Sequence, residues 1–151
     1  MTQSTYPGVT MNDLKCEHYK SIRDIFLETF DETELKGLGQ AWRNRTKEKC
    51  LGAFTKEGDL LGFVITTDHY VDYLAVHPLF QKYKIGTAML QTVLAKCRDD
   101  GDYLYLDHPV GQTHVRDWYI RNGFYQTTLK GRLGLIYHSY MTRSRKHLWK
   151  I

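Results

Sequence analysis

Apolar residues recur every three or four positions in several stretches of the chain, and this spacing predicts amphipathic helices. The helices predicted in this way cover residues 17–30, 32–47 and 85–98, and the residues at its two ends predict a fourth helix over 114–122. Helix 85–98 has the clearest apolar face, formed by Ile85, Ala88, Met89, Val93 and Cys97. Thr113 is predicted to cap the last helix at its N-terminus, and Gly123 is predicted to end it.

Short apolar stretches bounded by turn residues predict strands. They cover residues 49–55, 60–67, 71–76, 103–106, 124–130 and 134–142, and residues 1–12 form a loop or an irregular first strand. A strand–helix–strand order in the centre implies a parallel pair with a right-handed crossover, and hairpins on both sides imply a mixed sheet. The sequence therefore predicts an α/β fold: a single domain over residues 1–151, with a mixed central sheet that contains a parallel strand pair and is flanked by helices on both faces.

The composition is that of one globular domain, and it limits the classes of partner that we expect. Hydrophobic residues make up 42% of the 151 positions, and the net charge is +4, which suits an anionic cofactor as well as a nucleic acid. No block of Arg and Lys is long enough for a basic arm, so we expect no nucleic-acid partner. The longest apolar run, residues 60–65, is too short to cross a bilayer, and we expect no membrane partner.

The three cysteines Cys16, Cys50 and Cys97 are widely spaced and form no zinc-like pattern. We therefore expect no metal, and reduced thiols in a protein of the cytoplasm. The N-terminal residues lack the basic and apolar segments of a signal peptide, which agrees with that location.

The segment from Leu74 to Leu90, LAVHPLFQKYKIGTAML, is the most informative part of the chain. A strand ends here at His77-Pro78, and a short loop leads into helix 85–98. The first N–H groups of a helix lack intrahelical partners and its dipole favours negative charge, so such a junction can bind an anion. Lys82 and Lys84 beside these groups suit a phosphate, although an ordinary connection with solvated lysines has the same pattern.

The same segment resembles the acyl-CoA-binding motif of the GCN5-related N-acetyltransferase (GNAT) superfamily, Gln/Arg-x-x-Gly-x-Gly/Ala between a strand and a helix. Gln81 and Gly86 match this motif, and Lys84 stands where its first glycine is expected. Downstream, VRDWYIRNGFY is similar to the Phe-Tyr-x-x-x-Gly-Phe segment of the family, through Trp118, Tyr119, Gly123 and Phe124. The two motifs lie in the order of the family, and the predicted elements agree from about residue 15 onward.

The resemblance implies acetyl-CoA as the cosubstrate, held between two splayed parallel strands. The backbone of Leu74, Ala75 and Val76 would pair with the pantetheine amides. The pyrophosphate would bind backbone N–H groups of seven consecutive residues, namely Gln81, Lys82, Tyr83, Lys84, Ile85, Gly86 and Thr87. Gln112 stands where relatives often carry an asparagine that contacts the cofactor.

Lys84 departs from the family pattern. A glycine allows a positive φ or leaves room for phosphate oxygens, whereas the Cβ of a lysine favours a different loop conformation. The Lys84 ammonium either compensates by contacting a phosphate or points to solvent.

The resemblance also implies a direct attack of an amine on the thioester, with Tyr119 as the general acid. A phenol of ordinary pKa, about 10, is protonated at neutral pH and can donate to the leaving thiolate; a core aromatic is the alternative role for Tyr119. Asp72, early in the strand that ends at Val76, is the first candidate for the base. Four other residues at turns and strand ends are alternatives, namely Asp68, His69, Asp107 and His108, and solvent can also take the proton.

The acceptor implied by the resemblance is a primary amine, either of a small molecule or of a protein. The region from Trp42 to Arg45 either shapes the acceptor site or forms a solvated helix face. Relatives are often dimers, so a homodimer is left open. A non-catalytic acyl-CoA-binding module is the alternative function, supported by the missing glycine at position 84, and a small basic nucleic-acid-binding domain is a third.

Overall fold

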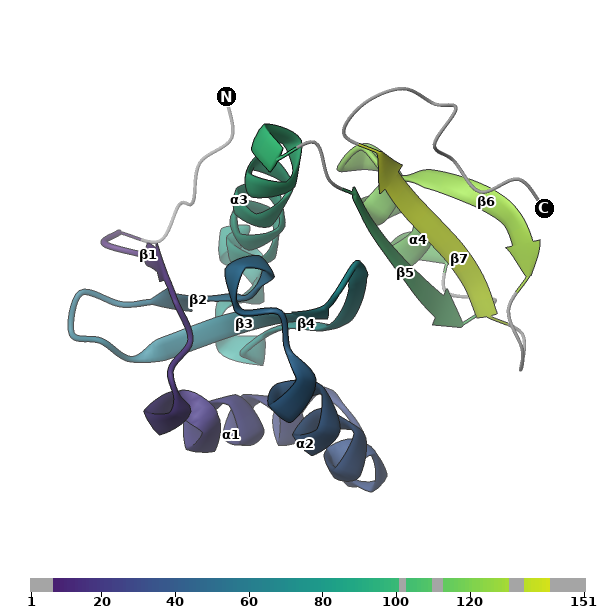
Figure 1. Cartoon of the computed structure of the whole chain (residues 1–151). Coiled ribbons are helices and arrows are strands. Elements are labelled where there is room, and N and C mark those ends of the chain that lie inside the picture. The colour runs from purple at the N-terminus through teal and green to yellow at the C-terminus, as the bar shows by residue number, and fades with distance from the viewer. Residues whose placement is uncertain (1–6, 101–102, 110–112, 131–134, 142–151) are drawn as a thin grey trace. The chain divides into compact units, whose positions relative to one another are not determined.

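The computed structural model describes residues 7–100, 103–109, 113–130 and 135–141 (Figure 1). For residues 100, 107–109, 125–130 and 135–141 the description covers the backbone alone. The chain divides into two compact units, residues 1–93 and 94–151.

The first unit contains four strands in the order β1-β2-β3-β4, each antiparallel to its neighbour. Their bounds are Thr10–Asn12 for β1, Leu51–Phe54 for β2, Leu60–Thr67 for β3 and Tyr70–Val76 for β4. The hairpin predicted between the strands near residues 49–55 and 60–67 is therefore confirmed, and residues 10–12 of the irregular first segment do form a strand.

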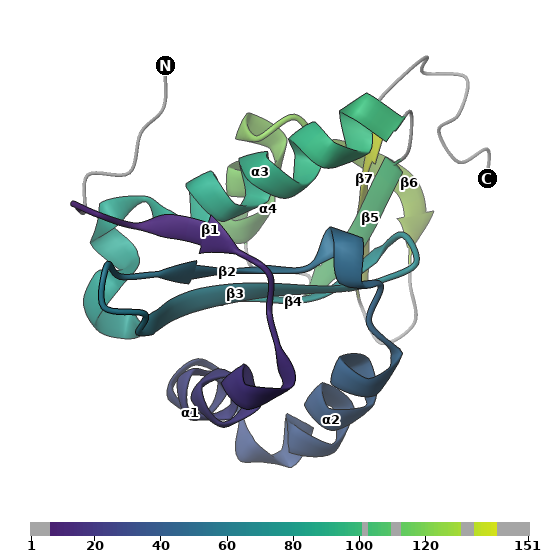
Figure 2. The ribbon, with the colours of Figure 1, turned by 60° about the vertical axis from the view of Figure 1, so that its left-hand side comes forward.

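Helices lie on both faces of this sheet (Figure 2). One face carries α1 (Tyr19–Thr29) and α2 (Leu35–Asn44). Three short 3-10 helices lie in the connections: η1 (Cys16–His18) precedes α1, η2 (Glu32–Glu34) precedes α2, and η3 (Lys47–Lys49) precedes β2. The opposite face carries the start of α3 (Ile85–Asp100), which follows the 3-10 helix η4 (Pro78–Tyr83).

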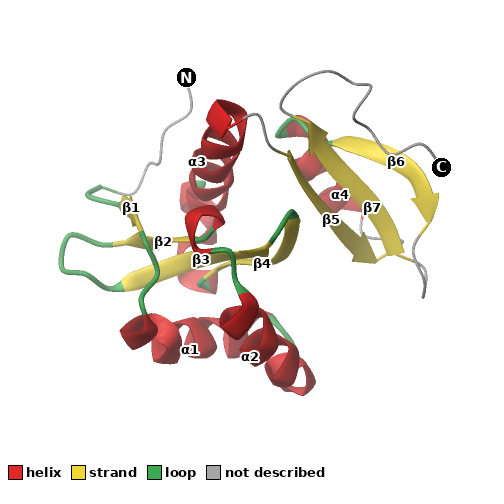
Figure 3. Cartoon of the chain, in the orientation of Figure 1, coloured by secondary structure: helices red, strands yellow, loops and turns green. Residues whose placement is uncertain are grey.

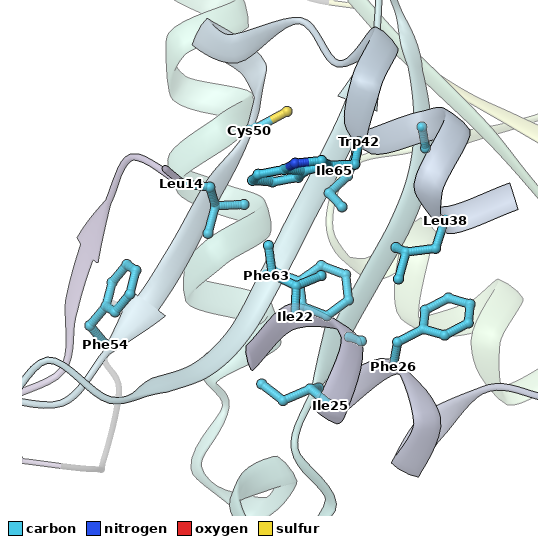
Figure 4. Close-up of a cluster of buried hydrophobic side chains, with 12 residues drawn as sticks. Leu14, Ile22, Ile25, Phe26, Leu38, Trp42, Cys50, Phe54, Phe63 and Ile65 are labelled. Carbon is cyan, nitrogen blue, oxygen red and sulfur yellow. The ribbon is translucent and has the colours of Figure 1, made fainter. Parts of the chain in front are cut away.

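The core of the first unit lies between β2–β4 and the helices α1 and α2. Figure 4 shows Phe63 and Ile65 of β3 directed toward Ile22 and Phe26 of α1. All four side chains are completely buried. Each such side chain contributes about 1.5–3 kcal/mol of transfer free energy, so the apolar periodicity of the sequence determines which face of each helix meets the sheet.

On the other face, a glycine allows α3 to approach the sheet closely. A Cβ added at Gly62 of β3 would lie 2.8 Å from the carbonyl oxygen of Ala75 and 3.0 Å from Cε of Met89 on α3. A backbone oxygen cannot yield as a side chain can, so only glycine fits between β4 and the start of α3 at this point.

The second unit contains β5 (Tyr103–Pro109), α4 (Thr113–Arg121), β6 (Tyr125–Lys130) and β7 (Leu135–Met141) (Figure 3). Its strands are antiparallel in the order β5-β7-β6. The predicted last pair of strands is therefore confirmed, and β5 extends to Pro109 because each of its residues from Tyr103 to Pro109 pairs with β7.

The helix predicted over residues 32–47 is wrong at its C-terminal end, because α2 stops at Asn44. Arg45 has extended backbone, with ψ at 146°. Its guanidinium carbon lies 3.6 Å from the centroid of the Trp42 ring, and Nη1 donates to the Trp42 carbonyl over 2.7 Å. The next residue, Thr46, donates its N–H to the carbonyl of Thr66 on β3 over 2.8 Å. The contacts of Arg45 with Trp42 and the hydrogen bond of Thr46 to the sheet thus replace the next helical hydrogen bonds.

Candidate functional site

The connection between β4 and α3 is more ordered than the predicted loop. It forms the 3-10 helix η4, which Pro78 begins and His77 caps: Nδ1 of His77 accepts a hydrogen bond from the N–H of Leu79 over 3.2 Å. Nε2 of Gln81 donates back to the carbonyl of Val76 over 3.0 Å. The side chain of the first motif residue therefore fixes the end of β4 relative to the segment that leads into α3.

Lys84, between η4 and α3, adopts the left-handed conformation, with φ 59° and ψ 27°. The expected change of loop conformation at this lysine is therefore not present. The backbone has the positive φ for which glycine is best suited, which gives a physical reason for the glycine of the family motif at this position. A non-glycine residue in this region stores about 1–2 kcal/mol of strain.

The first turn of α3 presents donors beside two exposed cations. Ile85 is completely buried and anchors the turn, whereas Gly86 and Thr87 are partly exposed. The first hydrogen bond of the helix runs from the N–H of Ala88 to the carbonyl of Lys84 over 3.1 Å, so the N–H groups of residues 85–87 precede the intrahelical ladder. Lys82 and Lys84 are both exposed. This arrangement favours an anion electrostatically.

Asp72 lies in a β-bulge of β4. Tyr73 pairs with Ile65 and Val71 pairs with Thr66, so Asp72 is the extra residue between them. Its carboxylate accepts a hydrogen bond from Oγ1 of Thr67 over 2.6 Å. Burial raises the pKa of Asp72, and hydrogen bonds from Thr67 oppose that rise. A partly buried carboxyl of raised pKa is a suitable proton acceptor for an amine.

The candidate acid, Tyr119, lies near the C-terminal end of α4 in the second unit. The helix ends in a Schellman motif: the N–H of Phe124 donates to the carbonyl of Tyr119 over 3.1 Å, and the N–H of Gly123 donates to the carbonyl of Ile120 over 3.0 Å. Gly123 has φ 98°, as the motif requires. The rings of Tyr119 and Phe124 pack edge to face, with centroids 5.4 Å apart.

This geometry explains the spacing Tyr-x-x-x-Gly-Phe. The tyrosine, the glycine and the phenylalanine occupy the three positions at which a Schellman motif needs a helical carbonyl, a positive φ and an apolar contact. Burial raises the pKa of Tyr119 to about 12, so the phenol is protonated throughout the neutral range.

The other candidates for the base have different surroundings. Asp68 is exposed in the β3–β4 turn, where its N–H donates to Oγ1 of Thr46 over 2.7 Å. His69 follows it, and Nδ1 of His69 lies 3.2 Å from Nζ of Lys49. Both residues therefore take part in the structure of the turn. The side chains of Asp107 and His108, and the whole of Gln112, lie outside the described residues.

The helix end from Trp42 to Arg45 fits the interpretation as a solvated helix face only in part. Trp42 is 9% exposed and belongs to the core, and Arg45 stacks on it. Arg43 and Asn44 form a solvated face. No pattern in the sequence indicates Thr67, whose hydroxyl donates to the Asp72 carboxylate over 2.6 Å; the contact depends on the pairing of β3 with β4.

Comparison with known proteins decides the family. The sequence profile of the acetyltransferase (GNAT) family matches residues 19–124 of the chain. The chain belongs to the GNAT acetyltransferase family. Comparison with the curated proteins found no match.

Solved GNAT structures share the fold of this chain. A GNAT-family acetyltransferase from Staphylococcus aureus Mu50 is 14% identical, with a TM-score of 0.74 over 90% of this chain and 100% of that one. The ribosomal-protein-S18-alanine N-acetyltransferase of Escherichia coli is 18% identical, with a TM-score of 0.73 over 94% and 99%. The PaiA N-acetyltransferase of Thermoplasma acidophilum, solved in complex with coenzyme A, is 17% identical, with a TM-score of 0.66 over 89% and 99%.

These comparisons confirm the predicted fold class, and they confirm that the chain is an acyltransferase of the GNAT family. The GNAT fold binds coenzyme A, as the PaiA complex illustrates. In the described part of the chain, no group of three or more His, Cys, Asp and Glu side chains could hold a metal ion. Nor does any described helix combine the length and the apolar character needed to span a bilayer.

Proposed function

We propose that this GNAT protein transfers the acetyl group of acetyl-CoA to a primary amine. The observation that carries the proposal is the junction of β4 and α3. There the motif residues Gln81 and Gly86 surround a left-handed residue 84, and two exposed lysines lie beside the first turn of α3. The N–H groups of residues 81–87 would hold the pyrophosphate, and the backbone of Leu74, Ala75 and Val76 would pair with the pantetheine amides.

The reaction proposed is a direct attack of the amine nitrogen on the thioester carbonyl. The C–N bond forms, the C–S bond breaks, and the amine loses one proton while the CoA thiolate gains one. Asp72, directly or through a water, accepts the amine proton, and Tyr119 donates a hydrogen bond to the leaving sulfur. Gln112 is proposed as a further polar contact of the cofactor.

The raised pKa of Tyr119 determines how this acid acts. A thiol has an ordinary pKa of about 8.5, so full proton transfer from a phenol of pKa about 12 to the thiolate is unfavourable. Tyr119 therefore stabilises the developing thiolate by hydrogen bonding in the transition state. The proton that finally reaches the sulfur comes from solvent, and Tyr119 keeps its own proton.

A non-catalytic acyl-CoA-binding module is the second candidate function. Its main support in the sequence was the missing glycine at position 84. That support weakens because Lys84 has the backbone conformation for which glycine is suited. A binding module would also not require Tyr119 at the Schellman end of α4 or the partly buried carboxylate of Asp72.

We also propose that residues 1–151 act as one domain, because the family profile spans both units. A place in the cytoplasm agrees with the free thiols of Cys16 and Cys50. The acceptor is proposed as the amine of a small molecule or of a protein, and a homodimer is the assembly to test by light scattering.

The experiment begins with calorimetric titration of the purified protein with acetyl-CoA. An amine panel that includes polyamines, amino sugars and peptide N-termini is then added, and free thiol is followed. Binding with turnover on an amine supports the enzyme, binding without turnover on any amine favours the binding module, and absence of binding contradicts both.

A further inference from the structure

We propose that Thr67 is a positioning residue that holds the Asp72 carboxylate in its orientation and in its ionised form. The inference rests on the proposed role of Asp72 as the base. Thr67 is the last residue of β3, and its hydroxyl donates a hydrogen bond to the carboxylate of Asp72 over 2.6 Å.

The β-bulge determines the direction of the Asp72 side chain. In a regular strand, Asp72 would lie opposite Thr66 and share its face of the sheet. Because Asp72 is the extra residue between Val71 and Tyr73, it is released from that pairing, and its carboxylate instead meets Thr67. Thr67 lies two positions after Ile65, which packs in the core under α1 and α2, so the carboxylate lies on that same face. Bulges commonly redirect a side chain in this manner next to active sites.

Thr67 holds the carboxylate with two donors. The hydroxyl lies 2.6 Å from Oδ2 of Asp72, a short distance typical of a hydrogen bond to a charged acceptor. Hydrogen bonds from the side chain and the backbone of Thr67 both lower the pKa of Asp72 against the larger effect of burial. The hydroxyl is the one of these donors that a substitution can remove.

The turn after Thr67 is itself fixed by η3 and the residue before it. Oγ1 of Thr46 accepts from the N–H of Asp68 over 2.7 Å, and Nζ of Lys49 donates to the carbonyl of Asp68 over 2.8 Å. Lys49 is 8% exposed, so its ammonium is held inside this turn. The turn cannot shift without losing these bonds, and Thr67 therefore presents its hydroxyl from a rigid support.

The ionisable groups that interact with Asp72 within the first unit do not stabilise its charged form. The thiol of Cys50 and the phenol of Tyr73 lie close enough for the Asp72 charge to raise the pKa of each, after the larger effect of burial. Both groups are neutral at neutral pH. Arg45 and Glu48 act on Cys50, and Glu34 acts on Tyr73. Burial is already the largest influence on the pKa of Asp72, and removal of the Thr67 hydroxyl takes away one of the two hydrogen bonds that oppose it, so the pKa rises further.

The test compares Thr67→Val, which keeps the shape and removes the hydroxyl, with Thr67→Ser, which keeps the hydroxyl. The pKa of Asp72 is measured by carboxyl NMR. In parallel, kcat/KM is measured against pH with an acceptor amine of low pKa, so that the acid limb of the profile reflects ionisation of the enzyme and not of the amine. For Thr67→Val we expect the pKa of Asp72 and the acid limb to rise together by about one pH unit, because a hydrogen bond to a charged group is worth about that much. Below the new pKa, kcat/KM then falls by up to about tenfold, while the KM for acetyl-CoA stays unchanged.

Thr67→Ser should keep the wild-type pKa of Asp72 and the wild-type acid limb. Thr67→Val added to Asp72→Asn should have no further effect on kcat. Thr67→Ala serves as a second variant without the hydroxyl if valine impairs folding. An unchanged pKa of Asp72 in the valine and alanine variants would overturn the inference, as would an acid limb that does not follow the pKa. A wild-type protein that binds acetyl-CoA but acetylates no amine would overturn the proposed function instead, and the NMR titration distinguishes the two failures.

Discussion

Replacement of Lys84 by glycine should make the protein more stable and weaken its hold on acetyl-CoA. The residue has φ 59° and lies directly before α3. A side chain in this region costs about 1–2 kcal/mol, which glycine does not incur. Glycine in turn adds about 0.4–1 kcal/mol of chain entropy to the unfolded state. The exposed ammonium is also repelled by the N-terminal end of the α3 dipole, by roughly 0.3 kcal/mol.

The net result is a gain of about 1 kcal/mol in the free energy of unfolding. For a chain of 151 residues, this corresponds to an increase in Tm of about 2–4 °C. The affinity changes in the opposite direction. An exposed charge contact with a phosphate is worth about 0.2–1 kcal/mol, so the Kd for acetyl-CoA should rise by up to about fivefold at low salt. This difference should vanish at high salt, because exposed charges are then screened.

Lys84→Gln is the matched control, because it removes the charge but keeps the backbone strain. It should weaken binding as much as Lys84→Gly does, without the increase in Tm. Thermal unfolding and calorimetric titration at two salt concentrations measure both quantities. The reasoning on strain is refuted if Lys84→Gly unfolds at or below the wild-type temperature. The reasoning on charge is refuted if Lys84→Gln binds acetyl-CoA as tightly as the wild type at low salt.

Three further predictions concern the other candidate residues. Tyr119→Phe keeps the ring packed on Phe124, so we expect kcat to fall by about 10²-fold with little change in Tm or acetyl-CoA affinity; comparable losses of kcat and affinity would count against the acid role. Gly123→Ala forces a Cβ into φ 98° and should lower the free energy of unfolding in urea by about 1–2 kcal/mol, and an unchanged midpoint would contradict the Schellman end of α4. Burial raises the pKa of Asp72, so the folded state favours the neutral form of this carboxyl. The resulting stabilisation of the fold is present below the ordinary carboxyl pKa of about 4, and it is lost as the pH rises through the raised pKa. Asp72→Asn should therefore raise Tm at pH 7 but not at pH 3, and an equal effect at both pH values would exclude ionisation as the cause.

Local patterns in the sequence were sufficient to predict most of the elements. Helices α1 and α3 follow from apolar residues three and four positions apart, because these positions share one face of a helix. Helix α4 was predicted from Thr113 and Gly123 at its two ends. The positive φ of Gly123 could also be predicted, since the groups that form the end of α4 are within five residues of one another. The order of the elements and two short motifs then indicated the family.

The candidate site depended on information that the local sequence does not carry. The end of α2 at Asn44 reflects contacts of Arg45 and Thr46, the latter with β3. The left-handed Lys84 contradicts the local preference of a lysine, and its conformation follows from the connection between η4 and α3.

Asp72 is the clearest case. In the sequence, Asp72 was one of several Asp and His residues that were candidates for the base. The register of β3 against β4 made it the bulged residue, the bulge brought its carboxylate to Thr67, and the surrounding core raised its pKa. The sequence by itself thus determined the helices, the strands and the family, because these depend on neighbours along the chain. Only the tertiary structure decided the environment of each candidate side chain, because strand register and burial depend on residues that are distant in sequence.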